Sequence, residues 1–429
     1  MTMLPVKEAE SIILSLVQPF DEQLDAEVVD LSAATGRILA SSVTSQLDFP
    51  HWDNSAMDGY AVRYTDVKSC NTQEPAVLEI VEEIPAGYQP KCSIQQGQAA
   101  RILTGACMPL GADTVVMQER TRREGNRVFI LEEPEPQAFV RHRASFYQAG
   151  TTLLRPGTIL NAPEIAVLAA AQCIKLPVYR RPRVAIFSTG NELVTPDQPL
   201  QSGQIVDSNQ YALAALVMQM GGIPQQLGIV PDEPEALKSA IAQVISSADI
   251  VLSTGGVSVG DYDYVDQILA ELGAEIHIRS VAVKPGKPLT VATFDSSLAQ
   301  GGQGKSGHRV LYFGLPGNPV SALVSCWRFV QPTLRKLSGL PQEVWESVFV
   351  QARSRHDLRS NGKVETYLWG RLHIVDGAYE FQLAGGSHSS GNLINLAQTN
   401  SLAVVPVPQT LIRAGEPVQV LQVSSTIGN

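Results

Sequence analysis

Three glycine-rich stretches carry residue types suited to binding an anion: FSTGNELV (187–194), LSTGGVSVG (252–260) and FGLPGNPV (313–320). Glycine lets the backbone approach a ligand closely, and free N–H groups at a turn or helix start bind phosphate or carboxylate. Tight turns explain each stretch taken alone, but three in one segment favour a shared site. The candidate ligand-binding residues in these stretches are Ser188, Thr189, Gly190, Ser253, Thr254, Gly255, Gly256, Ser258, Pro316, Gly317, Asn318 and Pro319.

Carboxylates gather beside these stretches, at Glu192, Asp207, Asp232, Asp261 and Asp263. Carboxylates repel a phosphate unless a cation lies between them, and Mg²⁺ is held by one or two carboxylates together with phosphate oxygens. The acids therefore indicate a magnesium-assisted site for a phosphorylated ligand. Helix capping and first-turn dipole stabilisation remain an alternative explanation for Asp207 and Asp261.

Two lysines stand three residues apart in VAVKPGKPL (281–289). Proline and glycine between them set a tight turn, so Lys284 and Lys287 can be directed at one anion. Solvation of an exposed turn explains the pair equally well.

Two polar segments lie outside this part of the chain, DNSAMDGYAVR (53–63) and RILTGACMPLGADTVVMQE (101–119). Their Gly, Asp, Asn and Thr residues are typical of loops, and loops often carry binding residues. Asp58 and Thr104 are therefore candidate ligand contacts. The sequence has no H-E-x-x-H motif and no cysteine pair at zinc-ligand spacing, so a zinc site is not expected.

The elements that must position the three glycine stretches alternate between short apolar strands and helices. Runs such as RVAIFST (183–189) and DIVLSTGG (249–256) are separated by helical patterns such as PEALKSAIAQVISSA (234–248). This rhythm predicts a parallel sheet with helices on both faces. Ligands bind outside the carboxyl ends of the strands in such sheets, which is where the glycine stretches fall.

Composition excludes several functional classes. The net charge is −10, which argues against a protein that mainly binds nucleic acid, because phosphate neutralisation needs clustered Lys and Arg. The five cysteines form no recognisable pair, so we expect reduced thiols and a cytoplasmic location. No apolar run approaches the roughly 18 residues that a membrane span requires, and no membrane association is expected.

Six motifs occur in the order DNSAMDGYAV, TGA…GADTVV, FSTGNEL, STGGVSVGDYDYV, VKPGKP and LPGNPVSA. Together they resemble the molybdopterin molybdenumtransferase family, which includes MoeA and the E domain of gephyrin, over essentially the whole chain. The resemblance implies insertion of molybdate into adenylylated molybdopterin, with release of AMP and formation of molybdenum cofactor. It also implies dependence on Mg²⁺, a homodimer, and a molybdopterin adenylyltransferase as upstream partner.

The expected fold class is a multidomain α/β and β protein with four domains. These are an N-terminal helical linker domain (1–45 with 147–180), an inserted β-rich arm domain (46–146), a doubly wound, MogA-like α/β domain (181–337) and a C-terminal β-barrel-like domain (338–429).

The resemblance also assigns roles to residues. The expected catalytic residues are Asp58, Thr104, Glu192, Asp232 and Asp263. The first two belong to an arm that, in the family, reaches over the active site of the neighbouring subunit. The last three match acids that handle metal and molybdate, and are the expected metal ligands. Further pocket residues are Lys284, Lys287, Pro316, Pro319, Arg141, and Ser390 from GGSHSSGNL (385–393).

One segment departs from the family pattern. Where the family shows N-x-R-x-R-G-E-D, this chain has FVRHRASF (139–146), so a family acid is replaced by Phe146. Two other functions stay open: adenylylation of molybdopterin by the same α/β domain, and non-catalytic binding or scaffolding of the cofactor. ATP consumption with molybdopterin would indicate the first, and tight binding without molybdate-dependent AMP release the second.

Overall fold

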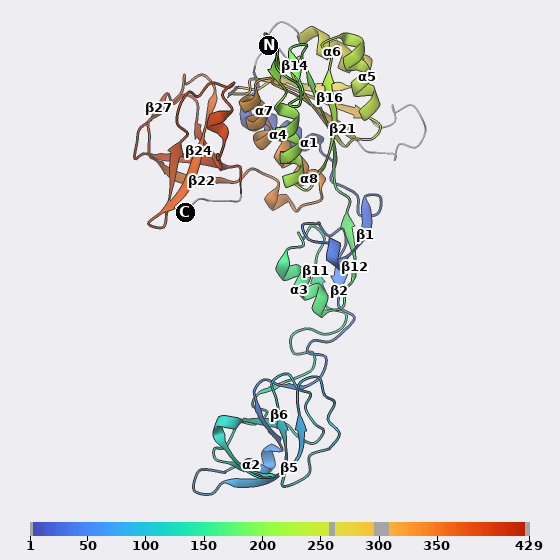
Figure 1. Ribbon diagram of the computed structural model, residues 1–429, viewed down its shortest axis with the longest axis vertical. Helices are drawn as coiled ribbons and strands as arrows, with labels where there is room; N and C mark the ends of the chain where they lie inside the picture. The colour runs from blue at the N-terminus through green and yellow to red at the C-terminus, as the bar shows by residue number, and fades with distance from the viewer. Residues whose placement is uncertain (1–2, 257–261, 296–308, 425–429) are drawn as a thin grey trace.

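The computed structural model describes residues 3–256, 262–295 and 309–424, with no side chains described for 262–264. The molecule is elongated (Figure 1). An α/β region and a C-terminal β region lie side by side at one end, a small linker region follows, and a β-rich arm forms the other end. None of the described helices is long and apolar enough to cross a membrane.

A six-stranded sheet forms the centre of the α/β region, in the order β16-β13-β17-β21-β20-β18. These strands are β13 (Arg183–Thr189), β16 (Ile223–Val230), β17 (Ile250–Thr254), β18 (Glu275–Ser280), β20 (Pro288–Asp295) and β21 (Arg309–Leu315). The four strands from β16 to β21 run parallel, which confirms the predicted parallel core. Strand β20 pairs antiparallel with both of its neighbours, a departure that the alternating pattern did not reveal.

Helices cover both faces of this sheet. One hydrophobic core includes residues of α4 (Asn209–Gln219), α7 (Pro319–Ser325) and α8 (Gln331–Leu337), and the other includes residues of α5 (Pro234–Val244) and α6 (Tyr262–Glu271). A π-helical turn, Cys326–Val330, joins α7 to α8. Full burial of each large apolar side chain in such cores contributes about 1.5 to 3 kcal/mol.

The N-terminal helix α1 (Val6–Leu16) packs with the α/β region. Its buried residues are Val6, Ala9, Ile13 and Leu16, a spacing of three and four that forms one apolar face. That face belongs to the same core as α4, α7 and α8. The expected division places residues 1–45 with the linker domain and stays a prediction; within that segment, α1 packs on the α/β core.

The linker region is built from two short strand pairs and one helix. Strand β1 (Ala26–Asp30) pairs with β12 (Lys175–Tyr179), and β2 (Val43–Thr44) pairs with β11 (Thr152–Leu154). Helix α3 (Ala162–Ala170) begins after Asn161, whose backbone N–H donates to the Glu164 carboxylate at 2.9 Å. This bond helps to satisfy the free donors at the helix start.

The arm is a second six-stranded sheet, in the order β7-β4-β6-β5-β9-β8. Its strands are β4 (Gly59–Val62), β5 (Ala76–Ile84), β6 (Gln98–Ile102), β7 (Thr114–Met117), β8 (Thr121–Glu124) and β9 (Arg127–Ile130). A short helix, α2 (Tyr64–Val67), and a strand pair, β3 (Asn54–Ser55) with β10 (Val140–Arg141), complete it. The predicted β character of the inserted region is confirmed.

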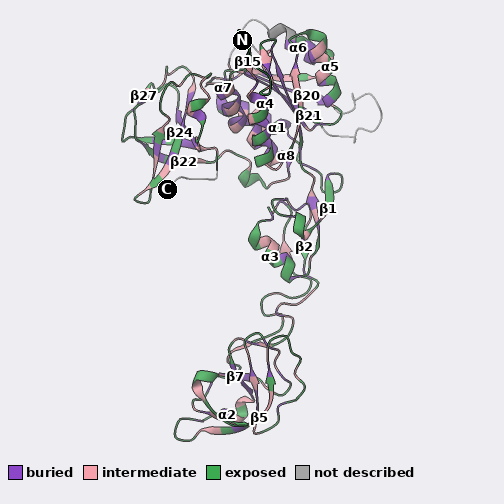
Figure 2. Cartoon of the chain, viewed as in Figure 1, coloured by how far each residue is buried: buried purple, intermediate pink, exposed green. Residues whose placement is uncertain are grey.

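The C-terminal region is a closed five-stranded barrel. Strands β24 (Glu365–Val375), β25 (Ala378–Leu383), β22 (Phe349–Ser354), β28 (Pro417–Gln422) and β26 (Ser401–Val405) pair in that order, and β26 pairs again with β24. Two short pairings add to it: β19 (Val283–Lys284) joins β24, and β23 (Leu358–Arg359) pairs with β27 (Leu411–Ile412). Buried residues concentrate in the strands and helices of the α/β region (Figure 2). Tyr367 and Trp369 of β24 are buried in the core shared with that region. The barrel therefore packs firmly against that region.

Candidate functional site

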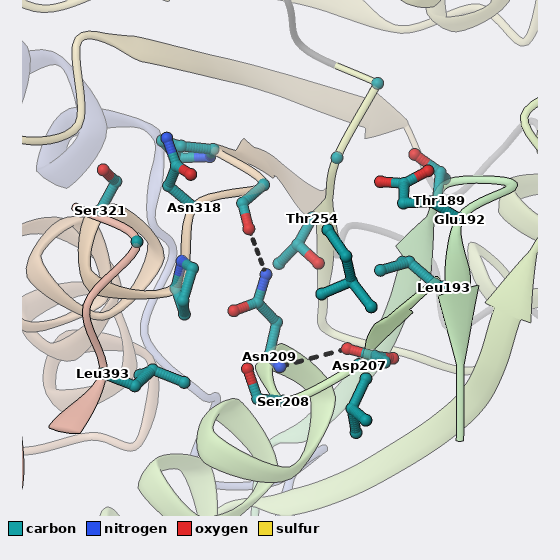
Figure 3. A pocket seen from close by; sticks show the side chains of 18 of the residues that line it. Thr189, Glu192, Leu193, Asp207, Ser208, Asn209, Thr254, Asn318, Ser321 and Leu393 are labelled. Carbon is teal, nitrogen blue, oxygen red and sulfur yellow. Dashed lines mark hydrogen bonds between the residues drawn. The ribbon is translucent and has the colours of Figure 1, made fainter. Parts of the chain in front are cut away.

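A cavity of about 800 Å³ lies at the carboxyl ends of β13, β17 and β21 (Figure 3). The starts of α4 and α7, the short parallel pair β14 (Leu193–Val194) and β15 (Ile205–Val206), and Pro288 complete most of its wall. The predicted residues that line it are Thr189, Glu192, Thr254, Gly255, Gly256, Pro316, Gly317, Asn318 and Pro319. All three glycine stretches thus meet at one cavity.

The backbones at these strand ends approach one another closely. A Cβ atom on Gly255 would lie 2.1 Å from the Thr189 carbonyl oxygen, and Gly255 has a φ of +89°. A Cβ on Gly317 would lie 3.5 Å from the Gly255 Cα. Only glycine fits at position 255, because a side chain there meets both a steric clash and an unfavourable backbone conformation.

Thr189 brings to the cavity a hydroxyl group that bonds to none of the described residues. Its Oγ1 atom is buried and has no hydrogen-bond partner among the described residues. Buried polar atoms are normally paired, and an unpaired one at a cavity wall is suited to bind a ligand. A hydroxyl both donates and accepts, so it can bind a phosphate or another polar group of a ligand.

Asp207 stabilises the start of α4. Its Oδ1 accepts from the Ser188 hydroxyl at 2.9 Å and from the Asn209 backbone N–H at 3.1 Å, while Oδ2 accepts from the Gln210 side-chain amide at 2.6 Å. The helix-start explanation for this acid is therefore confirmed. These bonds occupy its oxygens with protein donors.

The predicted binding residues Ser188 and Ser253, which lie within the strands, do not line the cavity. Ser188 donates to Asp207, as above, and its hydroxyl also lies 2.9 Å from the Thr254 hydroxyl. Ser253 is bonded to the buried Tyr312 hydroxyl at 2.6 Å. Successive side chains of a strand point to opposite faces, so Thr254 reaches the cavity and Ser253 does not.

Asn209 is a cavity residue that the sequence reasoning missed. Its side-chain Nδ2 donates to the Gly317 carbonyl at 2.8 Å, which ties the start of α4 to the turn before α7 (Figure 3). Helix α7 begins at Pro319, and the Asn318 side chain before it makes no capping bond within the described part of the chain. The position of Asn209 in the first turn of a helix beside a strand end was the available signal.

The predicted metal ligands are distributed over two loops and one helix. Glu192 lines the cavity, and its carboxylate fills the space beside Gly190, where a Cβ would lie 2.7 Å from its oxygens. Asp232 is exposed on the next loop, and its N–H donates to the Asn191 side chain at 3.3 Å. Asp263 belongs to α6, but its side chain is outside the described residues.

Two more predicted positions, Ser258 and Asp261, also lie outside the described residues. Within the described residues, no three His, Cys, Asp or Glu side chains gather closely enough to hold a metal ion by themselves. Glu192 is therefore the predicted ligand whose carboxylate the structure places at the cavity.

The two lysines lie on an exposed turn next to the cavity. Lys284 and Lys287 are exposed and are not among its lining residues, although Pro288 is. The turn packs against α7, because a Cβ on Gly286 would lie 2.7 Å from the Ser325 hydroxyl.

The C-terminal region contributes the Ser-Gly loop, residues 384–393. Gly391 and Leu393 line the cavity, and the Ser390 carbonyl accepts the backbone N–H of Val320 in α7 at 3.2 Å. The predicted residue Ser390 thus contacts the cavity wall through its backbone. The cavity is bounded by two regions that are separate in sequence.

The remaining predicted residues lie in the arm, far from this cavity in the same chain (Figure 1). Asp58 and Thr104 are both exposed and are bonded to each other, and Arg141 is exposed on β10. Backbone and side-chain hydrogen bonds from Thr104 lower the pKa of Asp58. The arm therefore presents an ionised carboxylate near its surface.

The segment that departs from the family pattern has its own local structure. Arg143 binds Asp48 through its guanidinium at 2.7 Å and Asp53 through its backbone N–H at 2.6 Å. The Phe146 side chain is 63% exposed and its ring centroid lies 5.7 Å from that of Phe49. An apolar surface thus replaces the missing acid.

The chain is similar to known proteins over nearly its whole length. Three family models match: "MoeA N-terminal region (domain I and II)" over residues 4–171, "Probable molybdopterin binding domain" over 185–336, and "MoeA C-terminal region (domain IV)" over 351–423. The sequence is 65% identical to a molybdopterin molybdenumtransferase from Nostoc over 417 residues, which is 97% of this chain and 93% of that one. It is 32% identical to the Haemophilus influenzae protein of the same name over 430 residues, 99% and 100% of the two chains.

Solved structures give the same result. The fold is similar to the molybdopterin biosynthesis MoeA protein from Pyrococcus horikoshii OT3, with a TM-score of 0.81 and 28% identity, covering 98% of this chain and 100% of that one. The similarity extends over the arm, linker, α/β and barrel regions together.

Proposed function

Because this chain belongs to the molybdopterin molybdenumtransferase family, we propose that its strand-end cavity binds adenylylated molybdopterin and inserts molybdate into it, releasing AMP. The chain is a transferase of molybdenum cofactor biosynthesis. The adenylylated form of the substrate would come from an upstream molybdopterin adenylyltransferase.

The observation that carries this proposal is the Thr189 hydroxyl, which has no partner among the described residues and lies where three glycine-rich strand ends meet. Gly255 and Gly317 bring these strand ends together without side chains between them, and both line the cavity, where an anionic group could approach the main chain. Preorganised donors of this kind bind a phosphoanhydride without reorganisation during the reaction. The chain needs no nucleophilic side chain, because the pterin dithiolene sulfurs receive the molybdenum.

Mg²⁺ fits this arrangement through Glu192. A hard cation of this kind is commonly held by one or two carboxylates plus substrate phosphate oxygens, and Glu192 supplies a carboxylate at the cavity wall. The bound ion would offset the charge of the phosphoanhydride. Asp232, on the loop that bonds to Asn191, is the second acid that we assign to this edge.

A homodimer would complete the site. Asp58, Thr104 and Arg141 lie on the arm, too far from the cavity of their own chain to contact its ligand (Figure 1). We assign them to the cavity of a second copy, where the ionised Asp58 would face the substrate.

The decisive experiment follows AMP release by purified protein with adenylylated molybdopterin, Mg²⁺ and molybdate. We expect molybdate-dependent release, and a fall of about tenfold in kcat/KM for Thr189→Val, which removes one hydroxyl of nearly the same size. Thr158→Val is a matched control, because that hydroxyl bonds the Arg155 carbonyl in the linker region.

Other outcomes would point elsewhere. AMP release that does not depend on molybdate would contradict the insertase assignment. Consumption of ATP with molybdopterin would favour adenylyl transfer. Tight binding of the substrate without turnover would favour a binding or scaffold role.

A further inference from the structure

We propose that His388 is a positioning residue: its imidazole, packed on Trp369 and bonded to Ala384, holds the Ser-Gly loop in the shape that closes the cavity wall. The inference rests on the proposed function only in taking the cavity ligand to be molybdopterin.

The loop is attached to the barrel at its start. The Ala384 backbone N–H donates to the Trp369 carbonyl at 3.1 Å. The His388 ring lies on the Trp369 ring with 4.8 Å between centroids and 50° between planes, and its Nε2 is 2.9 Å from the Ala384 carbonyl oxygen. The Ala384 N–H bond and the His388 ring contact therefore attach the loop to the same residue of β24, Trp369, and the Nε2 contact joins two residues within the loop.

The loop is attached to the α/β region at its end. The Ser390 carbonyl accepts from Val320 at the start of α7, and Leu393 packs against the core that contains Val320. Gly391 and Leu393, between and beside these attachments, form the loop's part of the cavity wall. His388 stands two residues before the Ser390 contact, so release of its ring frees the segment that carries the wall.

The hydrogen bond to Ala384 determines the form of the imidazole. A carbonyl only accepts, so Nε2 carries the proton and Nδ1 carries a lone pair. Nδ1 is buried and has no partner in the described structure. Burial lowers the pKa of His388, which keeps the ring neutral and preserves this arrangement.

The choice of histidine is itself informative. Trp369 is 1% exposed and its Nε1 also lacks a partner among the described residues. A phenylalanine at position 388 would fill the same space without leaving a buried nitrogen unpaired, and unpaired buried atoms cost free energy. The advantage of histidine therefore lies in its Nε2–H bond to the loop backbone.

Two variants separate the ring from the hydrogen bond. His388→Phe keeps an aromatic ring for Trp369 and removes the donor, whereas His388→Gln keeps an N–H donor and removes the ring. His373→Phe is the control, because His373 lies on β24 and not in the loop.

The proposal is tested by hydrogen exchange of the loop amides in the free protein, together with KM and kcat for adenylylated molybdopterin. For His388→Phe we expect exchange at residues 385–393 to accelerate by about tenfold, and KM to rise by about tenfold with kcat nearly unchanged. His388→Gln should restore part of the exchange protection, and His373→Phe should change neither quantity.

The proposal is overturned if His388→Phe leaves loop exchange at the wild-type rate, since the hydrogen bond would then not hold the loop. It is also overturned if Tm and kcat fall while KM rises, because changes in all three would indicate a general packing role for His388. Absence of turnover in the wild-type protein would refute the proposed function instead, and the exchange comparison would still decide the role of His388.

Discussion

One oxygen of Asp58 accepts two hydrogen bonds from Thr104: its Oδ1 lies 2.7 Å from the Thr104 backbone nitrogen and 2.7 Å from the Thr104 hydroxyl. The two residues adjoin the paired strands β4 and β6, where Gly59 lies opposite Ile102. This pairing brings together two polar segments that are distant in sequence. Charge-assisted bonds of this kind favour the ionised carboxylate.

Replacement of Thr104 by valine should raise the pKa of Asp58 toward its ordinary value. The backbone bond, which is the larger cause of the lowered pKa, remains, and the hydroxyl bond is lost. A carboxyl group with a lowered pKa in the folded state stabilises that state above its ordinary pKa, and this stabilisation disappears as the pH falls through the lowered value. In the variant, the pH range over which ionised Asp58 stabilises the folded state should begin closer to the ordinary pKa of the carboxyl group.

Carbon NMR of the carboxyl groups during an acid titration tests this. The carboxyl of Asp48 is an internal reference, because its lowered pKa is caused first by the Ala149 backbone bond and then by Arg143. An Asp58 titration curve identical in wild type and variant would show that the hydroxyl bond does not affect its ionisation.

Replacement of Asp207 by alanine should destabilise the α/β region strongly. Ser188, the start of α4 and the Gln210 side chain would each lose an acceptor inside the protein. Loss of a buried charged acceptor with several donors costs about 2 to 4 kcal/mol in the free energy of unfolding. Urea denaturation of wild type and variant measures this difference in the free energy of unfolding.

Asp207→Asn gives the graded comparison, since it keeps one acceptor oxygen in the same shape and should cost less. A free energy of unfolding for Asp207→Ala within about 0.5 kcal/mol of wild type would mean that water replaces the carboxylate, and would remove the structural role assigned to it.

Replacement of Gly255 by alanine should impair both folding and ligand binding. The new Cβ would lie 2.1 Å from the Thr189 carbonyl oxygen, and the residue would have to adopt a φ of +89°. We expect the free energy of unfolding to fall by about 2 kcal/mol or more. Thermal denaturation and equilibrium binding of molybdopterin measure the two effects. Gly150→Ala in the linker region is the matched control, because Gly150 has a φ of +88° but its Cβ would meet nothing within 4 Å; equal behaviour of the two variants would contradict the role of the close contact at Gly255.

The sequence predicted those features that depend on local pattern. Alternating strands and helices predicted the parallel core, and glycines at strand ends predicted where the cavity lies. Side chains alternate between the two faces along β17, so Ser253 and Thr254 must point in opposite directions. The sequence reasoning did not use this alternation. It placed both side chains at the ligand, and the structure buries one of them against Tyr312.

Features that depend on distant contacts were not accessible in the same way. The amphipathic pattern of α1 fixes which face is buried but not that α8 lies against it. The antiparallel direction of β20 depends on its pairing with β18 and β21. Asn209 ties α4 to the turn before α7 only because the Gly317 carbonyl oxygen, far along the chain, lies 2.8 Å from its Nδ2 atom.

Sharing of the site between two chains can be tested by mixing two inactive variants. Asp58→Asn damages the arm and Glu192→Gln damages the cavity, so each homodimer should lose most of its activity. In a mixed dimer the arm of one chain and the cavity of the other are both intact at one of the two sites. Random mixing makes half of the dimers mixed, so recovery of about a quarter of wild-type AMP release is expected.

Mixing Asp58→Asn with Thr104→Val is the matched control. Both changes lie on the arm, so no mixed dimer contains an undamaged arm, and activity should not recover beyond the mean of the two variants. Lack of recovery in the first mixture, with mixed dimers demonstrated by mass spectrometry, would place Asp58 outside the partner's site. The ionised Asp58–Thr104 pair would then be a feature of the arm alone, because the cavity of the same chain lies beyond its reach (Figure 1).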